Sequence, residues 1–233
     1  MKIAIMQPYF FPYIGYFQLI NSVDEFIIYD NIQYSKGGWI NRNRILVDSK
    51  DDYLTLPLKK DSDLLNVDQR FLADTWQSDR KKMLNKVFEC YRKAPYLDHV
   101  YPFIEKCLCV EEKNLFKFVF NSIKETLLYL TINTKITVSS TIEINHELRS
   151  EDKVLEICKA MKASHYINPI GGLELYNRKR FNGNGINLQF QKSNSICYSQ
   201  FNNDFVPWLS IIDILMFNTK EEVNLFLENY SLL

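Results

Sequence analysis

Two side chains in this sequence are the first candidates for proton chemistry. Asp30 ends a short apolar segment that begins near residue 25, and His146, followed by Glu147, stands just before a predicted helix. A carboxylate or an imidazole beside a ligand can accept a proton from an attacking amine. We therefore predict Asp30 and His146 as catalytic residues. The alternatives are a turn or helix-cap role for Asp30 and a structural role for His146.

The polar segment after Asp30 has the composition of a ligand-binding loop. Lys36 and Arg42 stand on either side of a glycine pair, which suits a loop that closes over a diphosphate. Trp39 can stack on a base or a sugar ring. Plain solvent exposure is the alternative for the two cations. The predicted substrate-binding residues of this segment are Gln33, Lys36, Gly38, Trp39, Asn41, Arg42 and Asn43.

The first twenty residues contain a second candidate loop. A short apolar run at residues 3–7 is followed by a loop with two prolines that is rich in amide and aromatic side chains. Such side chains hydrogen-bond sugar hydroxyls and stack on rings, whereas a simple turn favours glycine, serine and aspartate. Core packing is the alternative for the aromatic residues. The predicted substrate contacts here are Gln7, Tyr9, Tyr13, Gly15 and Tyr16.

A third candidate segment is Asn168-Pro169-Ile170-Gly171-Gly172. A glycine pair at the start of a helix leaves backbone N–H groups that can hold an anion. We predict that Asn168, Gly171, Gly172 and the nearby Tyr176 contact the substrate. A tight turn without a ligand is the alternative.

The elements that position these segments follow from hydrophobic periodicity. Strands near residues 3–7 and 25–30 enclose a helical pattern, which indicates a βαβ unit and a parallel sheet. Further strands are predicted near residues 135–139, 165–168 and 187–191, and helices at 150–161, 209–217 and 221–230. A short helix is expected to end near residue 176, and a hairpin is expected to turn at residues 49–52.

The middle of the chain, about residues 76–130, predicts three helices. The first has its apolar side chains on one face, which is expected to be buried: Trp76, Met83, Leu84, Val87, Phe88 and Tyr91. We predict one α/β domain over residues 1–233, an open, mostly parallel Rossmann-like sheet with this helical block as a layer or cap. Because open sheets bind ligands beyond the carboxyl ends of their strands, the three candidate segments should line one crevice.

Composition excludes several classes of function. The 28 Lys and Arg residues balance the 28 Asp and Glu residues, so general nucleic-acid binding has no support, although a donor carried on tRNA stays open.

The five cysteines lack a Cys-x-x-Cys pair and are predicted to be buried thiols of a reducing compartment. The three histidines lack metal-site spacing, and the sequence leaves the cofactor unknown. Without a signal peptide or an apolar run of ~20 residues, we expect a soluble, cytoplasmic protein with no membrane insertion.

One turn resembles a nucleotide-binding motif. Tyr13-Ile14-Gly15-Tyr16 resembles the His-Ile-Gly-His turn of the nucleotidylyltransferase and class I synthetase superfamily, which also lies between the first strand and the first helix. In that superfamily the glycine lets the nucleotide approach and the histidines stabilise the phosphoryl transition state. A tyrosine can donate a hydrogen bond but brings no positive charge. The turn therefore predicts nucleotide-binding geometry without adenylylation chemistry.

Nearly the whole chain resembles the WbqC-like protein family. The resemblance rests on residues 6–16, 36–44, 166–172 and 207–213, and the Gly-Gly-Trp-Ile-Asn-Arg-Asn stretch at 37–43 is the most specific part together with the opening motif. The resemblance implies a bacterial protein of O-antigen or other surface-polysaccharide biosynthesis that helps to finish a nucleotide-linked amino sugar. It supplies no catalytic residues, so the roles given above come from the residues themselves.

The resulting functional expectation is an enzyme. It would transfer an acyl or aminoacyl group from an unidentified donor to the amino group of a nucleotide-linked deoxyamino sugar. The alternatives are an ATP-dependent ligase or nucleotidylyltransferase-like enzyme, and a non-catalytic protein that binds sugar nucleotides.

Overall fold

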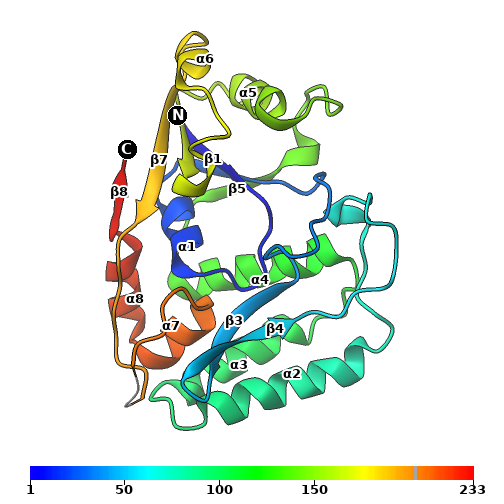
Figure 1. Cartoon of the computed structure of the whole chain (residues 1–233), viewed down its shortest axis with the longest axis vertical. Coiled ribbons are helices and arrows are strands. Elements are labelled where there is room, and N and C mark those ends of the chain that lie inside the picture. Colours follow the sequence, from blue (N-terminus) through cyan, green and yellow to red (C-terminus); the bar gives the residue numbers. More distant parts are fainter. Residues whose placement is uncertain (202–203) are drawn as a thin grey trace.

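A six-stranded sheet forms the centre of the computed structural model, which describes residues 1–201 and 204–233 (Figure 1). Its strand order is β5-β2-β1-β6-β7-β8, and β8 runs antiparallel to β7 whereas the other neighbours are parallel. Numbered along the chain, this is the order 3-2-1-4-5-6 of the Rossmann fold. The predicted open, mostly parallel sheet is confirmed. The strands are β1 (Lys2–Met6), β2 (Glu25–Ile28), β5 (Lys135–Val138), β6 (His165–Pro169), β7 (Asn187–Ser193) and β8 (Tyr230–Leu232).

Strand β1 is covered on both faces, which explains its continuous apolar run. Ala4 faces one core cluster together with Phe26 of β2, whereas Ile3 and Ile5 face the other. This alternation follows from the two-residue period of a strand. β1 pairs with β2 on one side and with β6 on the other, so the order of strands reverses at β1.

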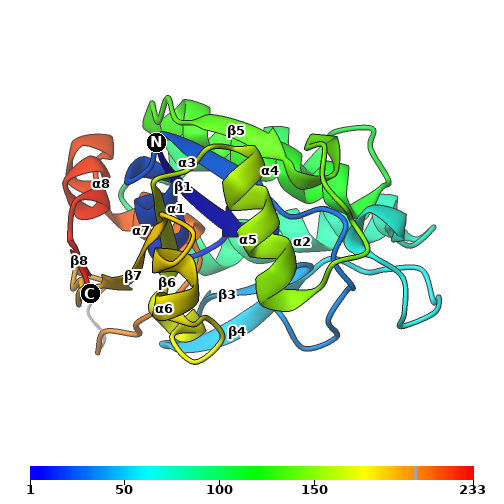
Figure 2. The same ribbon diagram turned by 90° about the horizontal axis from the view of Figure 1, so that it is seen from above.

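Helices cover the two faces of the sheet. Figure 2 shows α5 (Ser150–Ala160) lying over one face, and its side chains pack with Ile3 and Ile5 in the cluster that also holds Phe181 of α6 (Arg178–Asn182). The other face packs in one cluster with α1 (Ile14–Asn21), α7 (Ile211–Phe217), α8 (Lys220–Leu227) and the helices from the middle of the chain. Within the described part of the chain, no helix combines the length and apolar character that a membrane span requires.

The three predicted middle helices are present as α2 (Trp76–Tyr91), α3 (Leu97–Leu108) and α4 (Leu115–Leu130). The predicted buried face of α2 is wrong at Phe88, which is 42% exposed. The other five apolar residues of that face are buried. Phe88 instead packs edge-on against Tyr101 of α3 at the rim of the helical block.

The predicted hairpin is formed by β3 (Arg42–Val47) and β4 (Lys50–Thr55). Its turn comes earlier than expected, at Asp48 and Ser49, which both have positive φ angles of 47° and 65°. Two successive residues with positive φ make the type I′ turn that matches the twist of paired strands, so a two-residue loop suffices.

Some short helices begin or end at other residues than predicted. The helix expected to end near Tyr176 is a 3₁₀ turn, η3 (Ile170–Gly172), and α6 follows it. The helix expected at 209–217 starts at Ile211, because the Ser210 hydroxyl accepts the N–H of Ile212 and caps it. The other 3₁₀ turns are η1 (Val67–Gln69) and η2 (Ser139–Thr141).

The end of the chain also differs from the prediction. The last helix ends at Leu227 rather than at 230, and β8 then pairs with β7 through Gln191 and Leu232. Gln18 of α1 joins this region to the start of the chain, since its buried Nε2 donates to the carbonyl oxygens of Phe226 and Asn229 at 2.7 and 3.1 Å.

The cysteines differ in exposure, which corrects the prediction that all are buried. Cys107 and Cys158 are buried, and burial raises the pKa of both thiols, that of Cys158 to about 12. Cys109 and Cys197 are exposed, and Cys90 is intermediate. Cys109 is exposed because α3 ends at Leu108, so its side chain leaves the buried stripe.

Candidate functional site

A cavity of about 1010 Å³ opens beyond the carboxyl ends of β1, β2 and β6. It therefore lies where the order of strands reverses, the position at which open α/β sheets bind ligands. Its wall also includes the start of α5 and the segment around η1. The predicted site residues that line this cavity are Gln7, Tyr9, Gln33, His146, Asn168, Gly171, Gly172 and Tyr176.

These lining residues come from all three candidate segments. Gln7 follows β1, Gln33 follows β2, and Asn168 lies in β6. Asn168 is held by its neighbours, because its Oδ1 accepts the Tyr166 hydroxyl at 2.9 Å and its Nδ2 donates to the carbonyl oxygen of Pro169 at 3.0 Å. In the described residues the Gln7 side chain has no hydrogen-bond partner, so its amide is available to a ligand.

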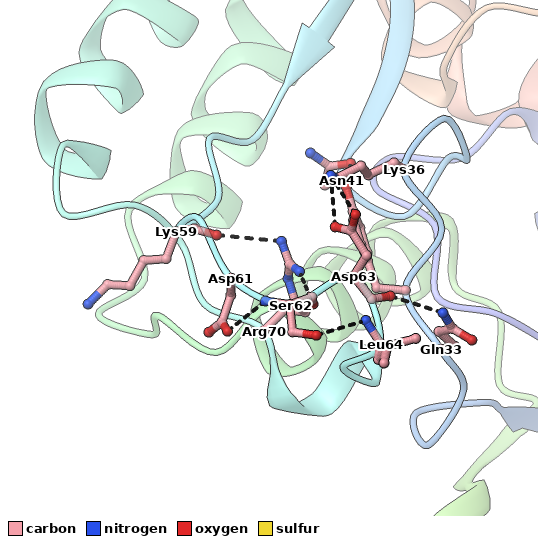
Figure 3. A network of polar contacts seen from close by, with 10 residues as sticks. Gln33, Lys36, Asn41, Lys59, Asp61, Ser62, Asp63, Leu64 and Arg70 are labelled. Atoms are coloured by element: carbon pink, nitrogen blue, oxygen red, sulfur yellow. Dashed lines mark hydrogen bonds and ion pairs between the residues drawn. The ribbon is translucent and has the colours of Figure 1, made fainter.

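The structure does not bring Lys36 and Arg42 into the cavity lining. The Lys36 ammonium forms an ion pair with Asp63 at 2.8 Å on an exposed surface (Figure 3). The Arg42 guanidinium donates to the carbonyl oxygen of Gly37 at 2.7 Å and lies over the Tyr53 ring at 4.5 Å. Both cations therefore have protein partners, and the diphosphate-binding role of this loop stays a prediction.

The rest of that segment mainly builds the loop. Gly38 donates its N–H to Ser35 in a turn, and the Trp39 ring lies 6.3 Å from that of Tyr53. The buried Asn41 accepts the Tyr34 hydroxyl at 2.8 Å and donates to the carbonyl oxygen of Leu56. The Asn-Arg-Asn stretch therefore contributes buried structural hydrogen bonds.

Asn43 holds the backbone of the candidate loop that follows β1. Its Nδ2 donates to the carbonyl oxygens of Phe10 and Phe11 at 3.1 and 3.0 Å, and the Ser210 hydroxyl also donates to Phe11 at 2.7 Å. Phe11 has a φ of 39°, a conformation that costs of order 1–3 kcal/mol for a bulky residue. These three hydrogen bonds hold the strained backbone of the loop to which the cavity-lining residues Gln7 and Tyr9 belong.

The Tyr-Ile-Gly-Tyr turn lies on the other side of this loop. Tyr16 is buried and donates its hydroxyl to the carbonyl oxygen of Gln7 at 2.9 Å. The Tyr13 ring covers Gly15, where a Cβ atom would clash with that ring and with the Ser193 hydroxyl. Tyr13 lines a second cavity of about 320 Å³ together with Trp208. The glycine thus makes room for protein atoms. Tyr13, Gly15 and Tyr16 are not among the lining residues of the main cavity, and the ligand contact predicted at this turn stays a prediction.

Asp30 lies just behind the cavity wall and is anchored by the residues that follow β5. Its carboxylate accepts the Ser139 hydroxyl at 2.7 Å, the Ser140 N–H at 2.9 Å and the Ser140 hydroxyl at 2.5 Å. The side chain is buried. Asp30 therefore ties the end of β2 to the end of β5, and its catalytic role stays a prediction.

Asn31 connects the cavity wall to His146. The Nε2 atom of His146 lies 3.0 Å from the carbonyl oxygen of Ile142, which can only accept, so Nε2 carries a proton. The Nδ1 atom lies 2.9 Å from the Asn31 amide nitrogen and accepts its N–H. This arrangement assigns His146 the neutral Nε2–H form with both ring nitrogens engaged, and its catalytic role stays a prediction.

Lys153 is a site residue that sequence reasoning missed. It lines the cavity although its side chain is only 5% exposed, and its Nζ lies 3.2 Å from Oδ1 of Asn31 and 5.1 Å from the Tyr29 ring centre. Burial lowers the pKa of the Lys153 ammonium, while the charges of Asp30, Glu147 and Asp68 oppose this effect. A signal existed, because Lys153 stands four residues before Ile157 on the buried stripe of α5.

Comparison with known proteins places the chain in a family. The family model described as "WbqC-like protein family" matches residues 7–225. The chain is 27% identical over 224 residues to an uncharacterized protein, Rv1507c, of Mycobacterium tuberculosis (strain ATCC 25618 / H37Rv), and the match covers 95% of each chain. No solved structure gives a significant match.

Proposed function

Because the chain belongs to the WbqC-like protein family, we propose that it transfers an acyl or aminoacyl group to the amino group of a nucleotide-linked deoxyamino sugar. The pathway would be the biosynthesis of a bacterial surface polysaccharide such as O-antigen. One observation carries this proposal: the cavity at the reversal point of the sheet. Its volume of about 1010 Å³ lies at the upper end of the range for ligand sites, which is roughly 300–1,000 Å³.

The chemistry of the wall supports a sugar ligand. Amide groups of Gln7, Gln33 and Asn168 line the cavity, and amides offer both donors and acceptors to hydroxyl groups. The rings of Tyr9 and Tyr176 supply flat surfaces on which a base or a sugar can stack. Such a mixture suits a ligand with many hydroxyls and one ring system.

The proposed reaction forms an amide. The amine nitrogen of the sugar attacks the donor carbonyl, a C–N bond forms, and the bond from the carbonyl to its leaving group breaks. The amine loses a proton, which we assign to Asp30 or His146 as acceptor. His146 must release the Asn31 N–H from Nδ1 before it can accept a proton, whereas the Asp30 carboxylate accepts three hydrogen bonds of the about four that it can accept. Backbone N–H groups at Gly171 and Gly172 would steady a second anion from the donor.

One observation favours an ATP-using enzyme as the second candidate. The Tyr-Ile-Gly-Tyr turn lies between β1 and α1, the place where nucleotidylyltransferases carry their histidine motif. The Tyr13 ring over Gly15 weighs against this candidate, because it occupies the space beside the glycine. ATP consumption during turnover would distinguish a ligase from an acyltransferase.

A thermal-shift screen tests the proposal. The ligands are dTDP-, UDP- and GDP-linked amino sugars, with ATP and coenzyme A alongside. A ligand at ~100 times its dissociation constant adds ~2.7 kcal/mol of stability. For a chain of this size that corresponds to roughly 5–11 °C in Tm. Product formation with an acyl donor would then be measured on the ligand that binds.

A matched pair of variants makes the screen specific for the cavity. Gln7→Leu removes an amide that lines it, whereas Gln77→Leu changes an exposed residue of α2 outside the lining. We expect Gln7→Leu to lose most of the ligand-induced shift and Gln77→Leu to keep it. Stabilisation by a sugar nucleotide that is equal in both variants would contradict the assignment of this cavity. Tight binding without product for any donor would indicate a non-catalytic binding protein.

A further inference from the structure

The start of α5 presents an unsatisfied buried cation to the cavity. The Lys153 ammonium has three N–H bonds, and in the described part of the chain its acceptors are two oxygen atoms of one residue, Asn31, at 3.2 and 3.5 Å. At least one N–H therefore has no acceptor, although the side chain is only 5% exposed. No described carboxylate lies within ion-pair distance of Nζ. A buried ammonium with an unpaired N–H and no carboxylate partner is costly, which points to an anionic ligand that completes it.

Arg149 adds a second cation at the residue that precedes α5. It lines the same cavity as Lys153, and its exposed guanidinium has no ion-pair or hydrogen-bond partner within residues 1–201 and 204–233. Arg149 has an extended backbone, and its carbonyl oxygen accepts the N–H of Lys153, so the two residues are joined at the helix start. A guanidinium and an ammonium held close together are the groups that proteins use for phosphate oxygens.

Backbone groups reinforce these two side chains. The N–H groups of Ser150, Glu151 and Asp152 open an 11-residue helix and have no acceptor in the described chain. Such N–H groups and the helix dipole favour an anion. Ser150 also has a φ of 48°, an uncommon conformation for serine, and it lies in the cavity lining.

Most of the nearby carboxylates have other partners. Glu151 and Asp152 pair with the guanidinium of Arg180 in α6, and Glu151 does so at 2.8 Å. Asp30, Glu147 and Asp68 act on Lys153 through their charges, but Asp30 is bonded to Ser139 and Ser140, and among these three only Glu147 belongs to the described cavity lining. The contrast with Lys36 and Arg42 is clear, because those cations already have protein partners.

We infer that Lys153, Arg149 and the first turn of α5 form the site for a diphosphate group. This inference deepens the proposed function, since it places the diphosphate of the sugar nucleotide against α5 rather than against residues 36–42. The chemistry recognised is a phosphoric anhydride, which a sugar nucleotide, a nucleoside diphosphate and ATP share. Lys153 and Arg149 are binding residues here and accept no proton in the reaction.

The test measures binding of inorganic pyrophosphate by calorimetry in four proteins: wild type, Lys153→Met, Arg149→Gln and Lys36→Met. Methionine keeps the apolar stem of Lys153, and Arg149 is exposed, so the glutamine variant keeps the inference testable if the buried variant folds poorly. We expect Lys153→Met and Arg149→Gln each to weaken binding about tenfold or more. Lys36→Met should stay within about twofold of wild type, because Lys36 pairs with Asp63.

Three results would overturn the inference: no pyrophosphate binding to wild type, equal binding to wild type and both α5 variants, or an equal loss in Lys36→Met. UDP, a UDP-linked amino sugar and ATP, tested on the same proteins, identify the natural source of the diphosphate. If pyrophosphate binding depends on Lys153 but no sugar nucleotide binds, the diphosphate site stands and the proposed function falls. If a sugar nucleotide binds equally with and without the Lys153 ammonium, the proposed function stands and this inference falls.

Discussion

The glycine pair of η3 offers a matched test of how tightly the cavity wall is packed. Gly172 is buried, and a Cβ atom at this position would overlap the Nδ2 atom of Asn168 and lie 3.1 Å from its Cγ and 3.3 Å from the Tyr176 ring. Gly171 is exposed, and a Cβ atom there would meet no atom within 4 Å. Substitution by alanine should therefore destabilise the protein at Gly172 and have little effect on its stability at Gly171.

The expected cost of Gly172→Ala follows from these contacts. The Asn168 side chain must move, which breaks its 3.0 Å hydrogen bond to Pro169 and disturbs the 2.9 Å bond from Tyr166. A lost hydrogen bond costs about 1 kcal/mol, and overpacking a tight site costs about 1–3 kcal/mol. We expect a total of about 3 kcal/mol, or roughly 6–12 °C in Tm. Gly171→Ala should change stability by less than about 1 kcal/mol.

Urea unfolding followed by circular dichroism measures both variants against wild type. The slope with denaturant should stay constant, so that the shift in midpoint reports stability alone. A Gly172→Ala protein within about 0.5 kcal/mol of wild type would refute the packing described for Asn168, since surface substitutions typically change stability by no more than this. An equal loss in Gly171→Ala would show that the whole turn, rather than one contact, is sensitive.

Three further outcomes follow from buried groups. Tyr91→Phe removes the hydroxyl that accepts the Leu46 N–H at 2.9 Å and donates to Asp213, so urea unfolding should show a loss of ~1–3 kcal/mol. Iodoacetamide on the native protein should label Cys197, whereas Cys158, with its pKa raised to about 12, should stay unmodified in mass spectra. The lowered pKa of Lys153 means that the folded protein binds fewer protons than the unfolded chain just below the ordinary lysine pKa. The free energy of unfolding of wild type should therefore rise relative to that of Lys153→Met as the pH rises toward about 10.4.

The sheet could be predicted because its signals are local. The apolar run of β1, the helix that follows and the second apolar run at residues 25–28 specify a βαβ unit without any knowledge of distant contacts. Ligands of open α/β sheets bind at the carboxyl ends of strands, and this rule predicted that Gln7, Gln33 and Gly171 line one cavity, as they do. These residues lie up to 164 positions apart, and topology alone places them together.

The cations of the site could not be predicted in the same way. Whether Lys36 reaches a ligand depends on Asp63, which a separate loop brings within 2.8 Å, and no periodicity encodes that contact. Lys153 is one of 28 Lys and Arg residues. It differs from most of them because it lies on α5 and lines the cavity. The strand β8 was missed because three residues at a sheet edge take their structure from β7 rather than from their own sequence.

The bonds from Gln18 to α8 have a consequence for how the protein is made. At a synthesis rate of about 5–20 residues per second, the carbonyl groups of Phe226 and Asn229 appear roughly 10–40 s after α1 leaves the ribosome. β1 can pair with β6 only after β6, which begins at His165, has been synthesised. Native contacts of such long sequence separation form slowly. The first strand and helix of the chain are therefore among the last to be completed, and their apolar faces need protection until the distant segments arrive.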